Sequence, residues 1–155
     1  MPTTLRTEIK QSKPFVSLEQ EALLSVERTA AVLGHGTAEA FKPHGITPTQ
    51  YNVLRILRGA GPEGLCRNEV RDRLVAQVPD VTRLLDRLEE MRLIERERDS
   101  DDRRLVKTRI TREGLHLLKR LDAPIASLHS RQLGHMSDTQ LRTLIDLLAL
   151  ARDGV

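Results

Sequence analysis

The stretch that most restricts the fold spans residues 79–111, where a helical pattern runs into two alternating segments. In "VPDVTRLLDRLEEMRL" the apolar residues recur every three or four positions, the period of a helix buried on one side. "LIERER" and "LVKTRI" then alternate, and the second places Val106, Thr108 and Ile110 on one face. A loop of aspartates and arginines joins them. The stretch therefore predicts a helix from 79 to 91 followed by a β-hairpin with a charged tip.

Hydroxyl residues followed three positions later by glutamine mark three further helix starts. In such a capping box the hydroxyl accepts from a first-turn amide and the glutamine side chain reaches back to the cap residue. Pro48 suits the first helical position, where its missing N–H is harmless. The pattern occurs at Ser17 and Gln20, at Thr47 and Gln50, and at Ser137 and Gln140.

The order of predicted elements is that of a winged helix with additional helices on both sides. Gly34 and Gly36 are expected to weaken or end the first helix, and Thr111 is expected to cap the helix after the hairpin. The fold class predicted is mainly α with a small antiparallel β-hairpin wing: a winged helix-turn-helix DNA-binding lobe plus a helical dimerisation region. The helices are expected at 18 to 33 or beyond, 48–58, 67–74, 79–91, 112–131 and 138–151.

The domain organisation predicted is a flexible N-terminal arm, residues 1–16, followed by one domain, residues 17–155. Within it, 47–111 form the winged lobe, and 17–42 with 112–155 form the helical region. The outer helices carry apolar stripes that need cover, either within the subunit or from a second copy. Since a short chain has few other elements to cover them, a homodimer is favoured. The C-terminal stripes are Leu115, Leu118, Leu121, Ile125 and Leu128, and Leu141, Leu144, Ile145, Leu148 and Ala151.

Composition narrows the function. Aromatic residues make up only 2% of the 155, so the core must be aliphatic and base stacking of single strands has little to work with. The net charge of +3 is mildly basic, and its many arginines suit phosphate recognition or simply reflect a GC-rich genome. With one cysteine, no apolar run near about 18 residues and no signal-like start, a cytoplasmic protein without membrane contact is expected.

The blocks "VTRLLDRLE", "LIER", "DRR" and "ITREG" stand in a register that resembles the DNA-binding half of MarR-type transcriptional regulators. The resemblance implies a homodimer on a pseudo-palindromic double-stranded operator, with the recognition helix in the major groove and the wing at the minor groove. It implies that Asp102 braces the wing and that Arg104, or Arg103, reaches the groove. The acids from Glu95 to Asp102 are expected to hold arginines in set rotamers. The expected DNA-binding residues are Pro79, Asp80, Thr82, Arg83, Arg87, Asp102, Arg103 and Arg104.

The chain also departs from the family pattern. Gln77, Pro79 and Asp80 occupy places where small hydroxyl residues are common, and Arg92 and Val75 stand where glycines are common. An aspartate suits a cytosine amino group but repels phosphate. Asp80 therefore keeps open an alternative, a protein-interaction module of the same fold without operator binding.

Family resemblance further implies a repressor released by a small aromatic or phenolic effector. Phe41, His44, Tyr51 and Arg55 are expected to line its site, although Phe41 and Tyr51 equally suit core packing. Cys66 is expected to be a filler or weak cap, with a redox switch as the alternative. The histidines lack metal-site spacing and no nucleophile–base or phosphate-loop motif stands out, so no metal, cofactor or enzymatic activity is expected.

Overall fold

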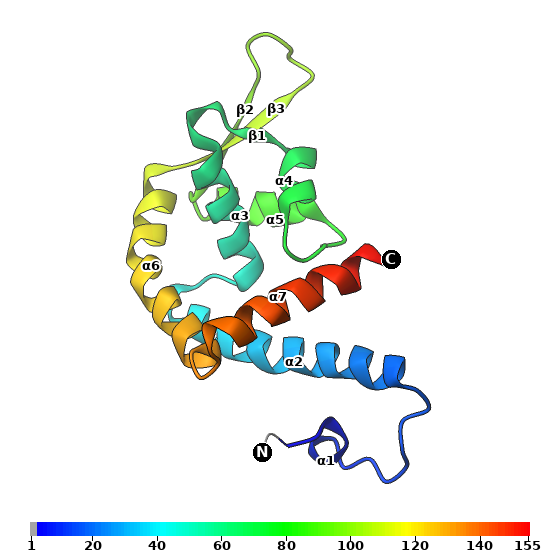
Figure 1. The fold of residues 1–155 in the computed structure, drawn as a ribbon. Helices are drawn as coiled ribbons and strands as arrows, with labels where there is room; N and C mark the ends of the chain where they lie inside the picture. The colour runs from blue at the N-terminus through cyan, green and yellow to red at the C-terminus, as the bar shows by residue number, and fades with distance from the viewer. Residues whose placement is uncertain (1–2) are drawn as a thin grey trace. The chain divides into compact units, whose positions relative to one another are not determined.

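The structure, a computed structural model, describes residues 3–155, and the chain forms two compact units, residues 1–40 and 41–155 (Figure 1). The division falls after Ala40, close to the expected end of the first helical segment at residue 42. Each unit is described by itself below.

The first unit holds α1 (Leu5–Glu8) and nearly all of α2 (Leu18–Phe41). The arm expected to be flexible thus contains one helical turn. From this turn the Arg6 guanidinium donates to the carbonyls of Gln11 and Ser12, which follow it. Glu8 of this turn lies 3.7 Å from Arg28 on α2.

The glycines of α2 do not end the helix, so of the two expected ends, residue 33 or beyond, the longer one is observed. The helix continues through Gly34 and Gly36 to Phe41, because glycine inside a helix costs only about 1 kcal/mol and leaves the backbone hydrogen bonds intact. After α2 the chain forms a 3₁₀ turn, Lys42–His44, closed by Gly45 at φ 69°.

Two of the three capping boxes form as predicted. The Thr47 hydroxyl accepts from the Gln50 amide at 3.1 Å, and the Gln50 side chain accepts from the Thr47 amide at 3.0 Å. Ser137 and Gln140 repeat this exchange. At Ser17 only the hydroxyl half forms, because the Gln20 side chain accepts instead from the Val16 amide at 2.7 Å.

The second unit is a winged helix with a three-stranded antiparallel sheet, in the order β1 (Leu65–Cys66), β3 (Val106–Ile110), β2 (Ile94–Arg98). The two predicted strands are confirmed, with Ile94 opposite Ile110 and Arg98 opposite Val106. The third strand, β1, was not predicted, since its two residues are too short to show alternation. The helices and strands of the second unit are, in chain order, α3 (Pro48–Ala60), β1 (Leu65–Cys66), α4 (Arg67–Arg73), α5 (Val81–Glu90), β2 (Ile94–Arg98), β3 (Val106–Ile110), α6 (Arg112–Leu133) and α7 (Asp138–Asp153).

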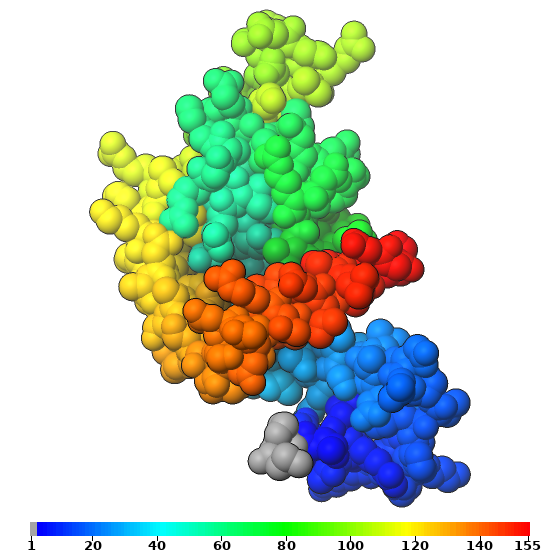
Figure 2. Space-filling model, in the orientation of Figure 1, coloured from blue at the N-terminus to red at the C-terminus, as the bar shows by residue number. Residues whose placement is uncertain are grey.

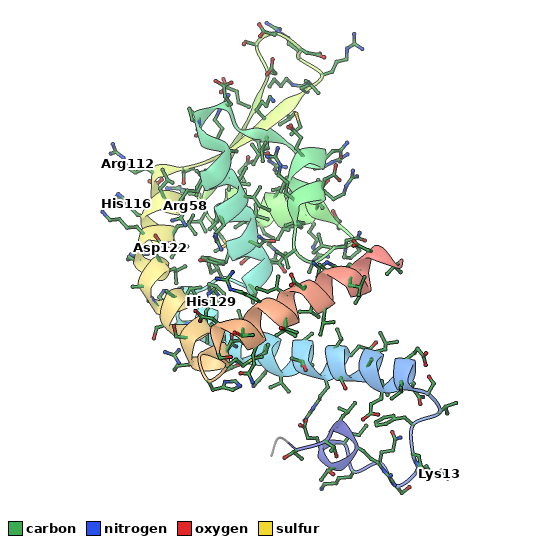
Figure 3. All side chains as sticks on the ribbon, viewed as in Figure 1. Lys13, Arg58, Arg112, His116, Asp122 and His129 are labelled. Atoms are coloured by element: carbon green, nitrogen blue, oxygen red, sulfur yellow. The ribbon has the colours of Figure 1, made fainter. Side chains whose placement is uncertain are left out.

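The core of this unit is aliphatic, as the composition predicts. Two residues that the periodicity placed on buried apolar faces are exposed. Met91 is exposed because α5 ends before it, and Leu115 is exposed while Leu117 is buried in its place. Arg58 of α3 and Asp122 of α6 face each other, with three nitrogen–oxygen contacts of 3.1 Å (Figure 3). The fully buried side chains include Val53, Leu54, Leu57, Val70, Leu85, Leu88, Leu118 and Leu121.

Within residues 3–155, no helix combines the length and apolar character needed to cross a bilayer.

Candidate nucleic-acid interface

Helix α5 presents a polar outer face over an apolar underside. Val81, Leu85 and Leu88 are buried, which fixes the rotation of the helix. Three of the expected DNA-binding residues are exposed on the helix: Thr82, Arg83 and Arg87.

The start of α5 differs from the prediction. Pro79 lies before the helix and does not form its first turn. Asp80 is the N-cap, and its carboxylate accepts from the Arg83 amide at 2.9 Å. Asp80 therefore has a structural task, since a capping carboxylate satisfies an otherwise unpaired first-turn amide and complements the helix dipole.

A groove of about 400 Å³ separates α5 from the wing. Thr82 and Leu85 line its α5 side, Arg67 of α4 lies beside them, and Arg104 lines the wing side. An Arg67 guanidinium nitrogen donates to the Thr82 hydroxyl at 3.1 Å. That contact leaves the Thr82 hydroxyl hydrogen available to an outside acceptor.

The wing loop is organised by Asp99. Its Oδ1 accepts from the Asp101 amide at 2.8 Å and from the Asp102 amide at 3.1 Å, and its own amide donates to the Leu105 carbonyl. The hydrogen bond from the Asp102 amide, and to a smaller extent that from the Asp101 amide, holds the pKa of the Asp99 carboxyl below its ordinary value. The loop backbone is thus held by a carboxylate that stays charged.

The loop backbone held by Asp99 positions Asp102 and the two wing arginines, Arg103 and Arg104. Asp102 Oδ1 accepts from the Arg104 amide at 3.0 Å and lies 3.8 Å from the Arg104 Nε. The Arg104 side chain is nevertheless 95% exposed, whereas the Arg103 carbonyl accepts from Arg98 at 2.8 Å. The loop projects from its unit as a separate lobe at the top of Figure 2.

The expectation that the acids of this stretch hold arginines is met in part, by Glu97 with Arg109 and by Asp102 with Arg104. Asp99 and Asp102 also hold backbone amides. The cross-strand ion pair joins Glu97 and Arg109 at 3.4 Å, and Arg109 also donates to the Pro62 carbonyl.

Arg92 takes the conformation that glycine would supply at this turn. Its φ is 60°, its amide donates to the Glu89 carbonyl, and the Leu93 amide donates to the Leu88 carbonyl. This pair of bonds is a Schellman ending for α5. The substitution of arginine for the common glycine therefore leaves the turn geometry intact.

Three residues that sequence reasoning did not select join the wing to α5. Arg96 of β2 binds Asp86 and Glu89. A signal for it does exist in the sequence: the strand period places Arg96 on the inward face with Ile94, where an arginine requires acidic partners.

The expected effector residues are only partly brought together. Phe41 is buried and packs on Tyr51 with ring centroids 4.6 Å apart, the core alternative. The Arg55 guanidinium carbon lies 6.0 Å from the Tyr51 ring centroid, and His44 is exposed on the 3₁₀ turn. An effector site here remains a prediction.

Cys66 is half-buried directly before α4, and its redox role also remains a prediction. Cys66 is the N-cap residue of α4, which confirms the expected cap position, and its amide donates to the Glu69 carboxylate at 2.7 Å. Over the described residues 3–155, no three histidine, cysteine or acidic side chains gather as a metal site.

Comparisons with known proteins agree with this geometry. The MarR family model matches residues 44–105. A MarR transcription factor structure from Planctomyces limnophilus is 42% identical, with a TM-score of 0.68 over 88% of this chain and 99% of that one. The regulator YkoM of Bacillus subtilis, an HTH-type transcriptional regulator, is 33% identical over 71% of this chain and 70% of its own length.

A third comparison concerns the fold alone. A mutant MarR from E. coli, solved as a complex with operator DNA, is 23% identical, with a TM-score of 0.75 over 96% of this chain and 99% of that one. With the wing, the helix-turn-helix and these relatives together, the chain belongs to the MarR family of DNA-binding transcriptional regulators, which are not enzymes.

Proposed function

We propose that the protein is a homodimeric repressor that occupies a roughly palindromic operator. In each subunit α5 enters the major groove and Arg104 enters the neighbouring minor groove. The observation that carries the proposal is the wing: its backbone is held by Asp99 and Asp102, while Arg104 is 95% exposed. Such an arginine loses little backbone freedom when it enters a narrow groove of negative potential.

The homodimer is supported by α7. None of its 16 residues is buried in the single chain, and even large apolar side chains are open to solvent: Ile145 is 63% exposed and Leu150 is 69% exposed. A helix whose large aliphatic side chains are left exposed is typical of an element that a protein partner covers. We expect sedimentation equilibrium to give a dimer, and Ile145→Glu to shift it to monomer. A monomeric wild type at micromolar concentration would refute this part.

The proposal includes a response to an effector. We infer that an aromatic or phenolic anion acts near Arg55, whose exposed guanidinium lies beside Tyr51. Titration of the protein–DNA complex with phenolic acids should release DNA, and Arg55→Met should raise the concentration required. Release that is unchanged in Arg55→Met would move the site elsewhere.

DNA binding itself is tested by salt titration on a duplex that the full-length protein selects from a random pool. Arg104→Ala should weaken binding and reduce the slope of log K against log salt by about one unit, the loss of one phosphate contact. Arg120→Ala is the control, because Arg120 is exposed on α6, outside the proposed surface. If Arg104→Ala matches wild type at every salt concentration, the wing role is wrong.

A further inference from the structure

Arg96 is held between the wing and the recognition helix. It lies on β2 opposite Thr108 of β3, and its side chain is only 23% exposed. Its Nε and one terminal nitrogen donate to the two oxygens of Glu89, at 3.0 and 3.2 Å. The same terminal nitrogen donates to Asp86 at 2.5 Å.

The two acids are neighbours on one side of α5. Asp86 and Glu89 are three residues apart, so they lie one above the other on the helix surface. Thr82 and Arg83 precede Asp86 by four and three positions, and both are exposed. A contact that fixes Asp86 and Glu89 therefore also fixes the direction in which the DNA-facing residues point.

We propose that Arg96 is a positioning residue for operator recognition, which holds α5 and the wing in one relative orientation. This inference rests on the proposed function. The planar guanidinium binds a carboxylate as a two-pronged fork and so restricts angle as well as distance. Through β2 it ties the helix that carries Thr82 to the hairpin that carries Arg104.

Arg96 also neutralises two acids on a helix that approaches phosphates. Hydrogen bonding to Arg96 is the main cause that holds the pKa of Glu89 below its ordinary value, so Glu89 stays charged. Without Arg96, Glu89 and Asp86 would both repel DNA. The orienting effect and the charge effect can be separated, since lysine retains the charge without the fork.

The protein supplies a matched control. Arg58 and Asp122 form a comparable two-pronged ion pair between α3 and α6, on elements that carry none of the proposed DNA-binding residues (Figure 3). Arg58→Lys therefore removes a similar fork without touching α5 or the wing.

The test measures the dissociation constants of selected operator and random duplex over a range of salt. Arg96→Lys should lose about tenfold in operator affinity, while random-duplex affinity and the salt slope stay within about twofold of wild type. Arg96→Met should bind both the operator and the random duplex more weakly than wild type. The neutralised combination Arg96→Met, Asp86→Asn and Glu89→Gln should recover random-duplex binding but not operator preference. Arg58→Lys should preserve that preference.

Three results would overturn the inference. Arg96→Lys could keep the full operator preference, the neutralised combination could restore it, or Arg58→Lys could lose it equally. Circular dichroism melting at equal protein concentration identifies any variant that fails to fold, and Arg96→Lys is the most conservative variant for the decision. A wild type without preference for any duplex would refute the proposed function and this inference together, whereas a preference that survives Arg96→Lys refutes only the inference.

Discussion

The clearest prediction concerns Asp80, because its capping role and its charge can be removed separately. Its carboxylate accepts from the Arg83 amide at 2.9 Å at the start of α5. Asp80→Ala removes the cap and the charge, whereas Asp80→Ser retains a capping oxygen and removes only the charge.

The expected magnitudes follow from the general cost of losing a cap and from Coulomb's law at an assumed distance of about 8 Å. Loss of an N-cap costs about 1 kcal/mol, which for a chain of this length lowers the melting temperature by roughly 2–4 °C. Serine caps nearly as well, so Asp80→Ser should melt within about 1 °C of wild type. Removal of one negative charge about 8 Å from a phosphate in water gains about 0.5 kcal/mol, or roughly twofold in DNA affinity.

Two measurements decide the matter. Thermal unfolding is compared at one protein concentration, because a dimer melts in a concentration-dependent way. DNA affinity is then compared on operator and random duplex for wild type, Asp80→Ser and Asp80→Ala. We expect Asp80→Ser to melt like wild type and to bind both duplexes somewhat more tightly.

One result would refute this reasoning. If Asp80 accepts from a cytosine amino group, Asp80→Ser should weaken operator binding by about 1–3 kcal/mol and leave random-duplex binding unchanged. Unchanged stability of Asp80→Ala would equally deny it a capping role.

Three further predictions concern the backbone of the winged lobe. Arg92→Gly should raise the free energy of unfolding by roughly 0.5–1 kcal/mol in denaturant titrations, because Arg92 has a φ of 60°, and a loss of stability would contradict this. Gly64→Ala should destabilise by more than about 1 kcal/mol, because φ is 68° and an added Cβ would lie 2.5 Å from the Thr108 carbonyl oxygen; wild-type melting would refute the strain. The lowered pKa of Asp99 means that its contribution to wing order is complete above the ordinary aspartate value and is lost as pH falls through the folded-state pKa. The protection factors of the wing amides, each taken relative to intrinsic exchange at the same pH, should therefore fall in acid, and Asp99→Asn should show no such acid-dependent step.

Much of the fold could be predicted because its signals are local. Thr47 and Gln50 find each other within one helical turn, and the stripe of Leu85 and Leu88 needs only helical periodicity. The two long strands were visible in their alternation. The sequence placed the start of α5 too early, at Pro79. Proline in the first turn and aspartate at the N-cap both satisfy local rules, so local rules did not choose between them. In the structure the helix begins at Val81, which is buried, and this makes Asp80 the N-cap.

The helices, the hairpin and the family could be predicted from the sequence alone, since each depends on residues close in the chain or on blocks in register. The contacts that hold the candidate interface together could not. Leu65 pairs with Thr108, Arg67 reaches Thr82, and Arg96 joins β2 to α5. These partners are separated in the chain and meet because burial of the aliphatic core brings their elements together, a result that local periodicity does not encode.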